Sequence, residues 1–246
     1  MGVLKKLIFR MKKAVAYLTL STTSTSATWS PQTVTNSGAV LTWDVSGDIA
    51  PTSQNVNDPT FDLSANTGTV DMNVYDVANL TAINIQTLNL TLLDITKAIQ
   101  LISINISTNN IVSLDLSQNV NLTSLICYSN SITTLNVDNN IALTYISVEF
   151  NPISLLNLNN NINLTNLYCQ QTSISTLDIS SNINVIDLAC HANNFTDTVT
   201  NSILASLVAN GKSNGTLQYR NNETGQGVTD RATLVSRGWT IYNYAT

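Results

Sequence analysis

The sequence predicts a β-rich solenoid, because one 21-residue pattern repeats six times between residues 69 and 194 without an insertion or deletion. The units begin at Thr69, Leu90, Ile111, Ile132, Ile153 and Ile174. Apolar residues also recur at the fourth, sixth, twelfth, fifteenth and seventeenth places of each unit. One unit cannot bury such a face alone, whereas a stack of units can.

Each unit contains the same phrase twice. In the third unit, Ile111-x-x-Leu114-x-Leu116-x-x-Asn119 is followed by Leu122-x-x-Leu125-x-Cys127-x-x-Asn130. This is the leucine-rich-repeat signature, and the alternation in its core is typical of a short strand. The predicted fold is therefore a leucine-rich-repeat solenoid of six 21-residue turns with two short parallel sheets, an N-terminal β cap and a C-terminal α/β cap.

Asparagines recur where each half-turn ends. One column holds Asn119, Asn140, Asn161 and Asn182, and the other holds Asn109, Asn130, Asn151 and Asn193. A short amide side chain can bond to the turning backbone and to the amide in the next rung. We therefore interpret both columns as structural ladders rather than as a ligand site.

The chain divides into four parts at these boundaries: residues 1–28, a basic amphipathic segment and a Ser/Thr-rich linker or extended arm; 29–68, an N-terminal β cap; 69–194, the solenoid; and 195–246, a C-terminal α/β cap. The N-terminal cap is expected to cover the first rung with Trp29 and Trp43 and to merge into the solenoid at Val70. An uncovered rung would expose unpaired backbone.

The C-terminal cap is predicted as helix, strand, helix, strand. Apolar residues at helical spacing predict a helix over 198–209, with Gly211 as its C-cap. A strand at Thr216–Tyr219, a second helix from Thr229 to Val235 ended by Gly238, and a strand at Trp239–Tyr242 complete the cap.

Half of the ten basic residues lie in the first 13 positions of a chain whose net charge is −5. They are Lys5, Lys6, Arg10, Lys12 and Lys13. The remainder of the chain is therefore acidic, which argues against nucleic-acid binding by the solenoid.

This basic start has two interpretations. Read from Met11 it is a poor secretion signal, because Tyr17 and Thr19 break its apolar run. Read from Met1 it has one apolar helical face surrounded by basic residues. We favour a retained docking segment, residues 1–17, that binds a protein shell or an anionic membrane surface. No stretch approaches 18 consecutive apolar residues, so a transmembrane helix is not expected.

The residues offer little support for catalysis. His191 is the only histidine, with Asp187 four residues before it, and it reads as a surface residue. Cys127, Cys169 and Cys190 share one inward column and read as buried thiols, although the last two are close enough to cross-link in principle. We therefore expect no enzyme activity and no cofactor.

An outward column at the fifth place alternates between Asp and Asn. It holds Asn73, Asp94, Asp115, Asn136, Asn157 and Asp178. A calcium site needs closely grouped carboxylates, and the amides interrupt them here. A calcium ladder is therefore the minor alternative, and no metal site is expected.

Aromatic residues gather at outward places of the second half-turns, on a surface that is otherwise Ser, Thr and Asn. Stacking the rungs would bring together Ile126, Tyr128, Tyr145, Glu149, Phe150, Tyr168 and His191. Tyrosines offer rigid contact area and suit protein or sugar recognition. Incidental packing against a neighbouring copy or a cap is an equal alternative.

The repeats resemble those of bacterial surface leucine-rich-repeat proteins and of related bacteriophage structural proteins. The resemblance rests on Leu177–Asn182 and Leu122–Asn130, on the leader-like Leu41–Asp48 and Pro59–Ser64, and on the ending Gly238–Ile241. It covers most of residues 40–246 and implies fold more strongly than function. A convincing signal peptide and a C-terminal sorting domain are both missing, which favours the phage type.

The expected function is that of a non-enzymatic spike-type protein on the surface of a phage virion. Its N-terminus would dock on capsid or other virion proteins, or contact a membrane surface, and the protein would form a homo-oligomer in the particle. The solenoid would then bind a host surface protein or glycan. The alternative is an exported leucine-rich-repeat adhesin, located on the bacterial cell surface or secreted, that binds a protein or a glycan.

Overall fold

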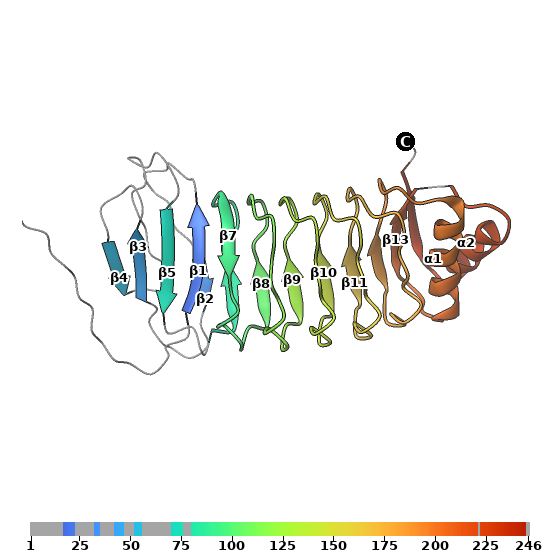
Figure 1. The fold of residues 1–246 in the computed structure, drawn as a ribbon. Coiled ribbons are helices and arrows are strands. Elements are labelled where there is room, and N and C mark those ends of the chain that lie inside the picture. The colour runs from blue at the N-terminus through green and yellow to red at the C-terminus, as the bar shows by residue number, and fades with distance from the viewer. Residues whose placement is uncertain are drawn as a thin grey trace, which may run out of the picture.

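A computed structural model of the chain describes residues 80–220 and 222–244 with their side chains, and the backbone of five strands before them. These strands are β1 (Tyr17–Thr22), β2 (Gln32–Val34), β3 (Thr42–Ser46), β4 (Thr52–Asn55) and β5 (Val70–Tyr75). The docking residues Lys5, Lys6, Arg10, Lys12 and Lys13 lie outside the described residues. The described chain forms an elongated stack of coils, with the early strands at one end and two helices at the other (Figure 1).

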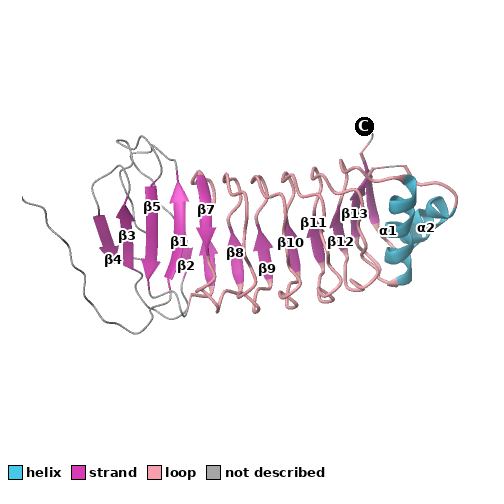
Figure 2. Ribbon diagram, in the orientation of Figure 1, coloured by secondary structure: helices cyan, strands magenta, loops and turns pink. Residues whose placement is uncertain are grey.

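Each coil contributes one short strand to a single parallel sheet. These strands begin two residues after the twelfth-place apolar residue. They are β6 (Ala82–Asn84), β8 (Ser103–Asn105), β9 (Ser124–Ile126), β10 (Tyr145–Ser147), β11 (Asn166–Tyr168) and β12 (Asp187–Ala189). They pair in order and without slippage, so that Ile104, Leu125, Ile146 and Leu167 lie side by side. Figure 2 shows these strands on one side of the coils and loops on the other.

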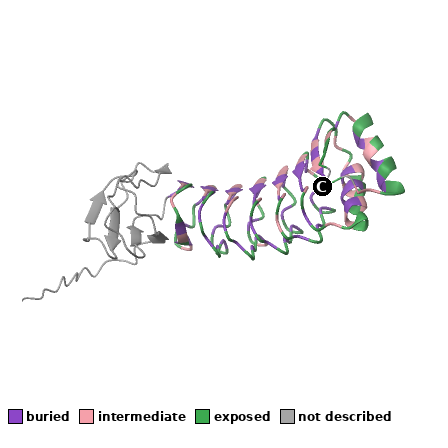
Figure 3. Cartoon of the chain, turned by 90° about the horizontal axis from the view of Figure 1, so that it is seen from above, coloured by how far each residue is buried: buried purple, intermediate pink, exposed green. Residues whose placement is uncertain are grey.

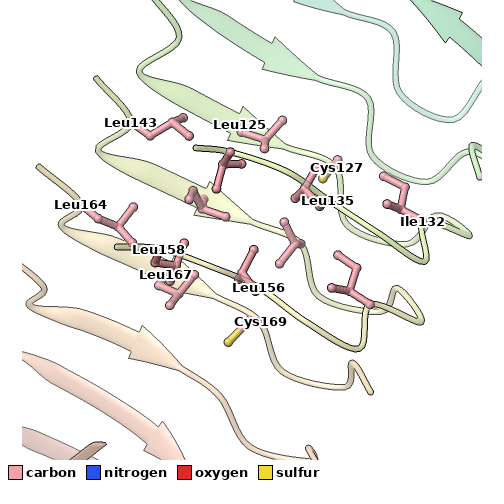
Figure 4. Close-up of a cluster of buried hydrophobic side chains, with 14 of the residues drawn as sticks. Leu125, Cys127, Ile132, Leu135, Leu143, Leu156, Leu158, Leu164, Leu167 and Cys169 are labelled. Atoms are coloured by element: carbon pink, nitrogen blue, oxygen red, sulfur yellow. The ribbon is translucent and has the colours of Figure 1, made fainter. Parts of the chain in front are cut away.

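The predicted apolar columns form the core wherever the structure describes them. Every described member of the six columns is buried along the stack. Leu80 at its start and Cys190 at its end are each 1% exposed. Figure 4 shows how these side chains point inward from both sides of successive coils. The leucine-rich-repeat solenoid is therefore confirmed for the coils from residue 80 to residue 194.

The prediction of two parallel sheets is wrong, because the first half-turns do not pair as strands with one another. On that side β7 (Leu90–Asp94) is the one strand among the described coils, and its partner is the antiparallel β1. Later first half-turns share single backbone bonds, such as Ser131 N–H to the Ile111 carbonyl at 2.9 Å. The sheet prediction therefore holds for one side of the solenoid.

The fifth-place Asp and Asn residues form local turns on this side of the coils. Each one from Asp94 to Asp178 accepts a bond from the backbone N–H two residues later; Asp115 accepts from Ser117 at 2.9 Å and Asn136 from Asp138 at 2.8 Å. Such a local turn uses an N–H group that a sheet would give to the neighbouring strand. The same bond lowers the pKa of Asp115 and of Asp178.

The two asparagine columns tie neighbouring coils together. The Asn140 amide donates to the carbonyls of Leu116 and Asn119 in the preceding coil, at 3.1 and 2.8 Å. In the other column, Asn130 donates to the carbonyl of Ile106 at 3.0 Å and accepts from the N–H of Ile111 at 3.1 Å. The structural interpretation is confirmed, but the partners are main-chain groups rather than the amide side chains of the next rung.

The N-terminal strands are arranged differently from the expected linker and merging cap. β1, which falls within the expected linker or arm, lies antiparallel between β5 and β7. β5 therefore does not stack directly on Leu90, although it occupies the equivalent place in the predicted first unit. β3 and β4 extend this antiparallel sheet, and β2 pairs antiparallel with β6 at the edge of the parallel sheet.

The C-terminal elements occur in the predicted order: α1 (Asp197–Ala209), β13 (Thr216–Tyr219), α2 (Gln226–Ser236) and β14 (Thr240–Asn243). The two strands continue the parallel sheet beyond β12. α1 begins at the cap Thr196, whose hydroxyl accepts from Val199 N–H, and Gly211 takes a positive φ of 72° after its end.

α2 starts earlier than predicted, because Gly225 at φ 52° reverses the chain directly before it. Thr229, the predicted cap, therefore lies inside the helix. Leu204, Leu207 and Leu234 join the core, while the outer helical faces are exposed (Figure 3). Neither helix has the length and apolar composition needed to cross a membrane, and no other helix occurs among the described residues.

Replacing Asn140 by Ala should lower the free energy of unfolding by about 1–3 kcal/mol, because the carbonyls of Leu116 and Asn119 each lose one of their two donors and the link between coils is broken. Chemical denaturation followed by circular dichroism would measure the change. The neighbouring Asn139 is exposed, so Asn139→Ala is the matched control and should cost below ~0.5 kcal/mol. Equal effects of the two substitutions would contradict the structural role of the buried column.

The three cysteines are free and fully buried, in agreement with the interpretation as packed thiols. Burial raises the pKa of Cys190 to about 12, and it also raises the pKa values of Cys127 and Cys169. Because the thiolate is the reactive form, a thiol reagent at pH 8 should label none of the three in the folded protein. Mass spectrometry should find three labels after denaturation, and labelling of the native fold would contradict this burial.

Candidate recognition face

The outward side of the parallel sheet carries three columns of side chains. Alternate residues of a strand point to opposite faces, so the fourteenth, sixteenth and eighteenth places of each unit lie outward. The strand register places Ile126, Ser147 and Tyr168 beside one another in the middle column. Ser147 is 2% exposed although it lies outward, so larger side chains around it cover it. The face is therefore a packed surface over these coils.

Two tyrosines form its centre. The rings of Tyr145 and Tyr168, on adjacent strands, have centroids 5.4 Å apart and planes tilted by 52°. The Tyr168 hydroxyl donates to Oδ2 of Asp187, which also accepts from the Asn166 amide at 3.3 Å. Burial and then the bond to Asp187 raise the pKa of Tyr168 to about 12. Tyr168 is therefore held by a hydrogen bond, and the Tyr145 ring packs against it.

Glu149 lies beside this pair in a partly desolvated position. Its Oε2 accepts from the Ser147 hydroxyl at 2.9 Å. Burial raises the pKa of Glu149, and the bonds from its own backbone N–H and from Ser147 offset only part of that rise. Burial chiefly raises the pKa of Tyr145 as well, and the charges of Glu149 and Asp187 add to it. Both carboxylates therefore act on the same tyrosine.

His191 lies at the C-terminal end of the face and stacks on Tyr244. The ring centroids are 4.0 Å apart and the planes differ by 17°. The Tyr244 hydroxyl donates to Oε1 of Gln218 at 3.2 Å. Burial lowers the pKa of His191, which favours the neutral ring. The sequence did not predict this contact, because Tyr244 lies two residues beyond the predicted last strand, Trp239–Tyr242.

The structure brings together most of the predicted patch. Ile126, Tyr128, Tyr145, Glu149, Tyr168 and His191 are all half-buried on the sheet face. Phe150 instead lies in the turn after β10, where it is 50% exposed and has a φ of 57°. The nineteenth place has a positive φ in every coil described, so this backbone conformation is a property of the repeat. The residue types at that place did not predict it.

The opposite side of the coils carries shallow grooves. One, of about 570 Å³, is lined by Ser113, Asp115, Thr134, Asn136 and Leu155 among others. A second, of about 790 Å³, continues from Leu155 to α1. The carboxylates of Asp115 and Asp178 are held in the local turns described above, and that of Asp138 accepts from the Asn157 amide at 3.0 Å. The described residues contain no group of three His, Cys, Asp or Glu placed to hold a metal ion. The grooves therefore lack the donor set of a calcium ladder.

Comparisons with known proteins find similar folds and no close relative. No protein-family model matches the chain, and no curated protein matches it. An internalin (inlF) of Listeria monocytogenes has a TM-score of 0.57 and 18% identity over 68% of this chain and 48% of its own. Another, internalin C2, has a TM-score of 0.55 and 18% identity over 68% of this chain and 76% of its own.

A leucine-rich-repeat protein of Leptospira interrogans has a TM-score of 0.50 and 14% identity over 68% of this chain and 49% of its own. The chain thus spans about half the length of two of these three structures. At such low identity the likeness concerns the fold alone. The chain is similar to internalins and other leucine-rich-repeat proteins, and it has the leucine-rich-repeat solenoid fold with its parallel strands in one sheet.

Proposed function

We propose that this chain is a non-enzymatic recognition protein that binds a protein surface through the outward side of its parallel sheet. The observation that carries the proposal is the fixed tyrosine pair, Tyr145 and Tyr168, flanked by half-buried polar groups on an otherwise small-residue face. Rigid tyrosines bury large areas at low entropic cost and often dominate binding energy. A stacked solenoid also offers a long, stiff surface to a partner.

The setting that we favour is a bacteriophage particle. In this proposal the basic segment with Lys5, Lys6, Arg10, Lys12 and Lys13 docks on other virion proteins, and the sheet face contacts a host surface protein. The acidic composition of the remaining chain supports separate roles for the two regions, docking for the basic segment and host contact for the solenoid. An exported bacterial surface protein that binds a host protein or glycan is the second candidate, because two of the similar solved folds are internalins.

Replacing Tyr145 and Tyr168 together by Ser should reduce binding of the labelled protein to cells of its host by about tenfold or more, since central aromatic contacts are lost. Cell-associated fluorescence measured across a concentration series would give the change. Leu155→Ser is the matched control, because Leu155 is 65% exposed on the opposite side. Unchanged binding by the double variant, or no binding by the unaltered protein, would contradict the proposed face.

The intact mass of the protein isolated from its natural source separates the two settings. A mass that includes residues 1–17, found in purified particles, is expected for the virion protein. A mass that starts between residues 20 and 30, found outside particles, would overturn that setting and favour the exported protein.

A further inference from the structure

The centre of the sheet face holds two carboxylates whose charges are only partly satisfied. Glu149 accepts from the neutral hydroxyl of Ser147, and Oδ2 of Asp187 accepts from Tyr168 and Asn166. The other oxygen of Asp187, Oδ1, is buried and has no hydrogen-bond partner among the described residues. Desolvated carboxylates are costly unless a cation or further donors compensate them.

No basic side chain of the described solenoid compensates these charges. The ion pair found in the described chain joins Arg231 to Glu223 in the C-terminal cap. Arg220 is the one Lys or Arg at a described outward place of the sheet, in the eighteenth-place column continued on β13. It lies three strands from Glu149, which at 4.8 Å per strand is about 14 Å. It is one strand from Asp187 but four residues further along, which at 3.3 Å per residue is about 13 Å. No basic side chain of the described solenoid therefore pairs with either carboxylate.

We infer that the site formed by Tyr145, Glu149, Tyr168 and Asp187 binds the guanidinium group of an arginine side chain on a protein partner. This inference rests on the proposed function and names the chemistry of the partner. A guanidinium is planar, stacks on an aromatic ring and donates through a fork to carboxylate oxygens. The tyrosine pair offers the ring surface and the half-buried Glu149 offers a carboxylate acceptor, while the charge of Asp187, whose Oδ1 is buried, adds to the negative potential at Tyr145.

Other ligand chemistries fit these residues less well. The compact ammonium of a lysine can approach one carboxylate but cannot stack as a plane on the rings. A neutral sugar could stack on tyrosine and donate hydroxyls, but it would leave both negative charges uncompensated in their partly buried positions. An acidic partner would be repelled. Arginine alone combines the charge, the donors and the flat surface.

The test is an NMR titration of the full chain, with labelled tyrosine rings, against ethylguanidinium chloride and ethylammonium chloride at constant ionic strength. We expect saturable shifts of Tyr145 and Tyr168 with the guanidinium and about tenfold weaker binding of the ammonium. Glu149→Gln should weaken guanidinium binding by about tenfold, since a charge-assisted bond becomes a neutral one. Asp115→Asn, on the opposite side, removes the same charge and should leave the titration unchanged.

The outcomes separate this inference from the proposed function. Absence of guanidinium shifts at the two tyrosines, or equal responses to both cations, would overturn the arginine site even if the tyrosine double variant loses cell binding. A different result would keep the cation site and reject the recognition role. In that case guanidinium binding would depend on Glu149, but the tyrosine double variant would bind cells as well as the unaltered protein. The comparison of the two cations uses the unaltered protein, so it does not depend on a variant folding.

Discussion

The stacking of coils depends on buried amides that connect each coil to the one before it. Asn119, Asn140, Asn161 and Asn182 each donate to two carbonyls of the preceding coil, at 2.8–3.2 Å, from positions with no more than 1% exposure. The apolar columns supply most of the driving force for burial, but they do not by themselves fix the height of one coil over the next. Directional hydrogen bonds to the main chain fix this height, and they keep the 21-residue register along the described stack.

The two sides of the coil differ in how their main chains pair. On one side β6 and β8 to β12 form a continuous parallel sheet. On the other side, Asp or Asn at the fifth place of each described coil accepts a bond from the backbone N–H two residues later, and the extended segments form no strands apart from β7, where Asp94 makes the same bond. Similar Leu-x-Leu phrases thus give a sheet on one side and mostly turns on the other.

The sequence was sufficient for every feature that follows from local periodicity. The buried columns, the asparagine positions and the alternation that turns Tyr145 and Tyr168 outward all depend on residues within one unit. The insertion of β1 between β5 and β7 could not be predicted in this way, because it pairs residues 48 or more positions apart through main-chain hydrogen bonds, which do not depend on particular side chains. The stacking of Tyr244 on His191 was missed for a similar reason, since it depends on how the last strand continues the sheet.

The candidate site depends on both kinds of information. Periodicity places two tyrosines and Glu149 on one face, but only the strand register brings Asp187 against Tyr168, so that the charges of both Glu149 and Asp187 act on Tyr145. The coils beneath this face are close-packed, so these side chains have little room to rearrange. In the recognition role that we propose, such a face would select its partner by charge as well as by shape. A surface built from similar repeats would in this way become specific at one place along its length.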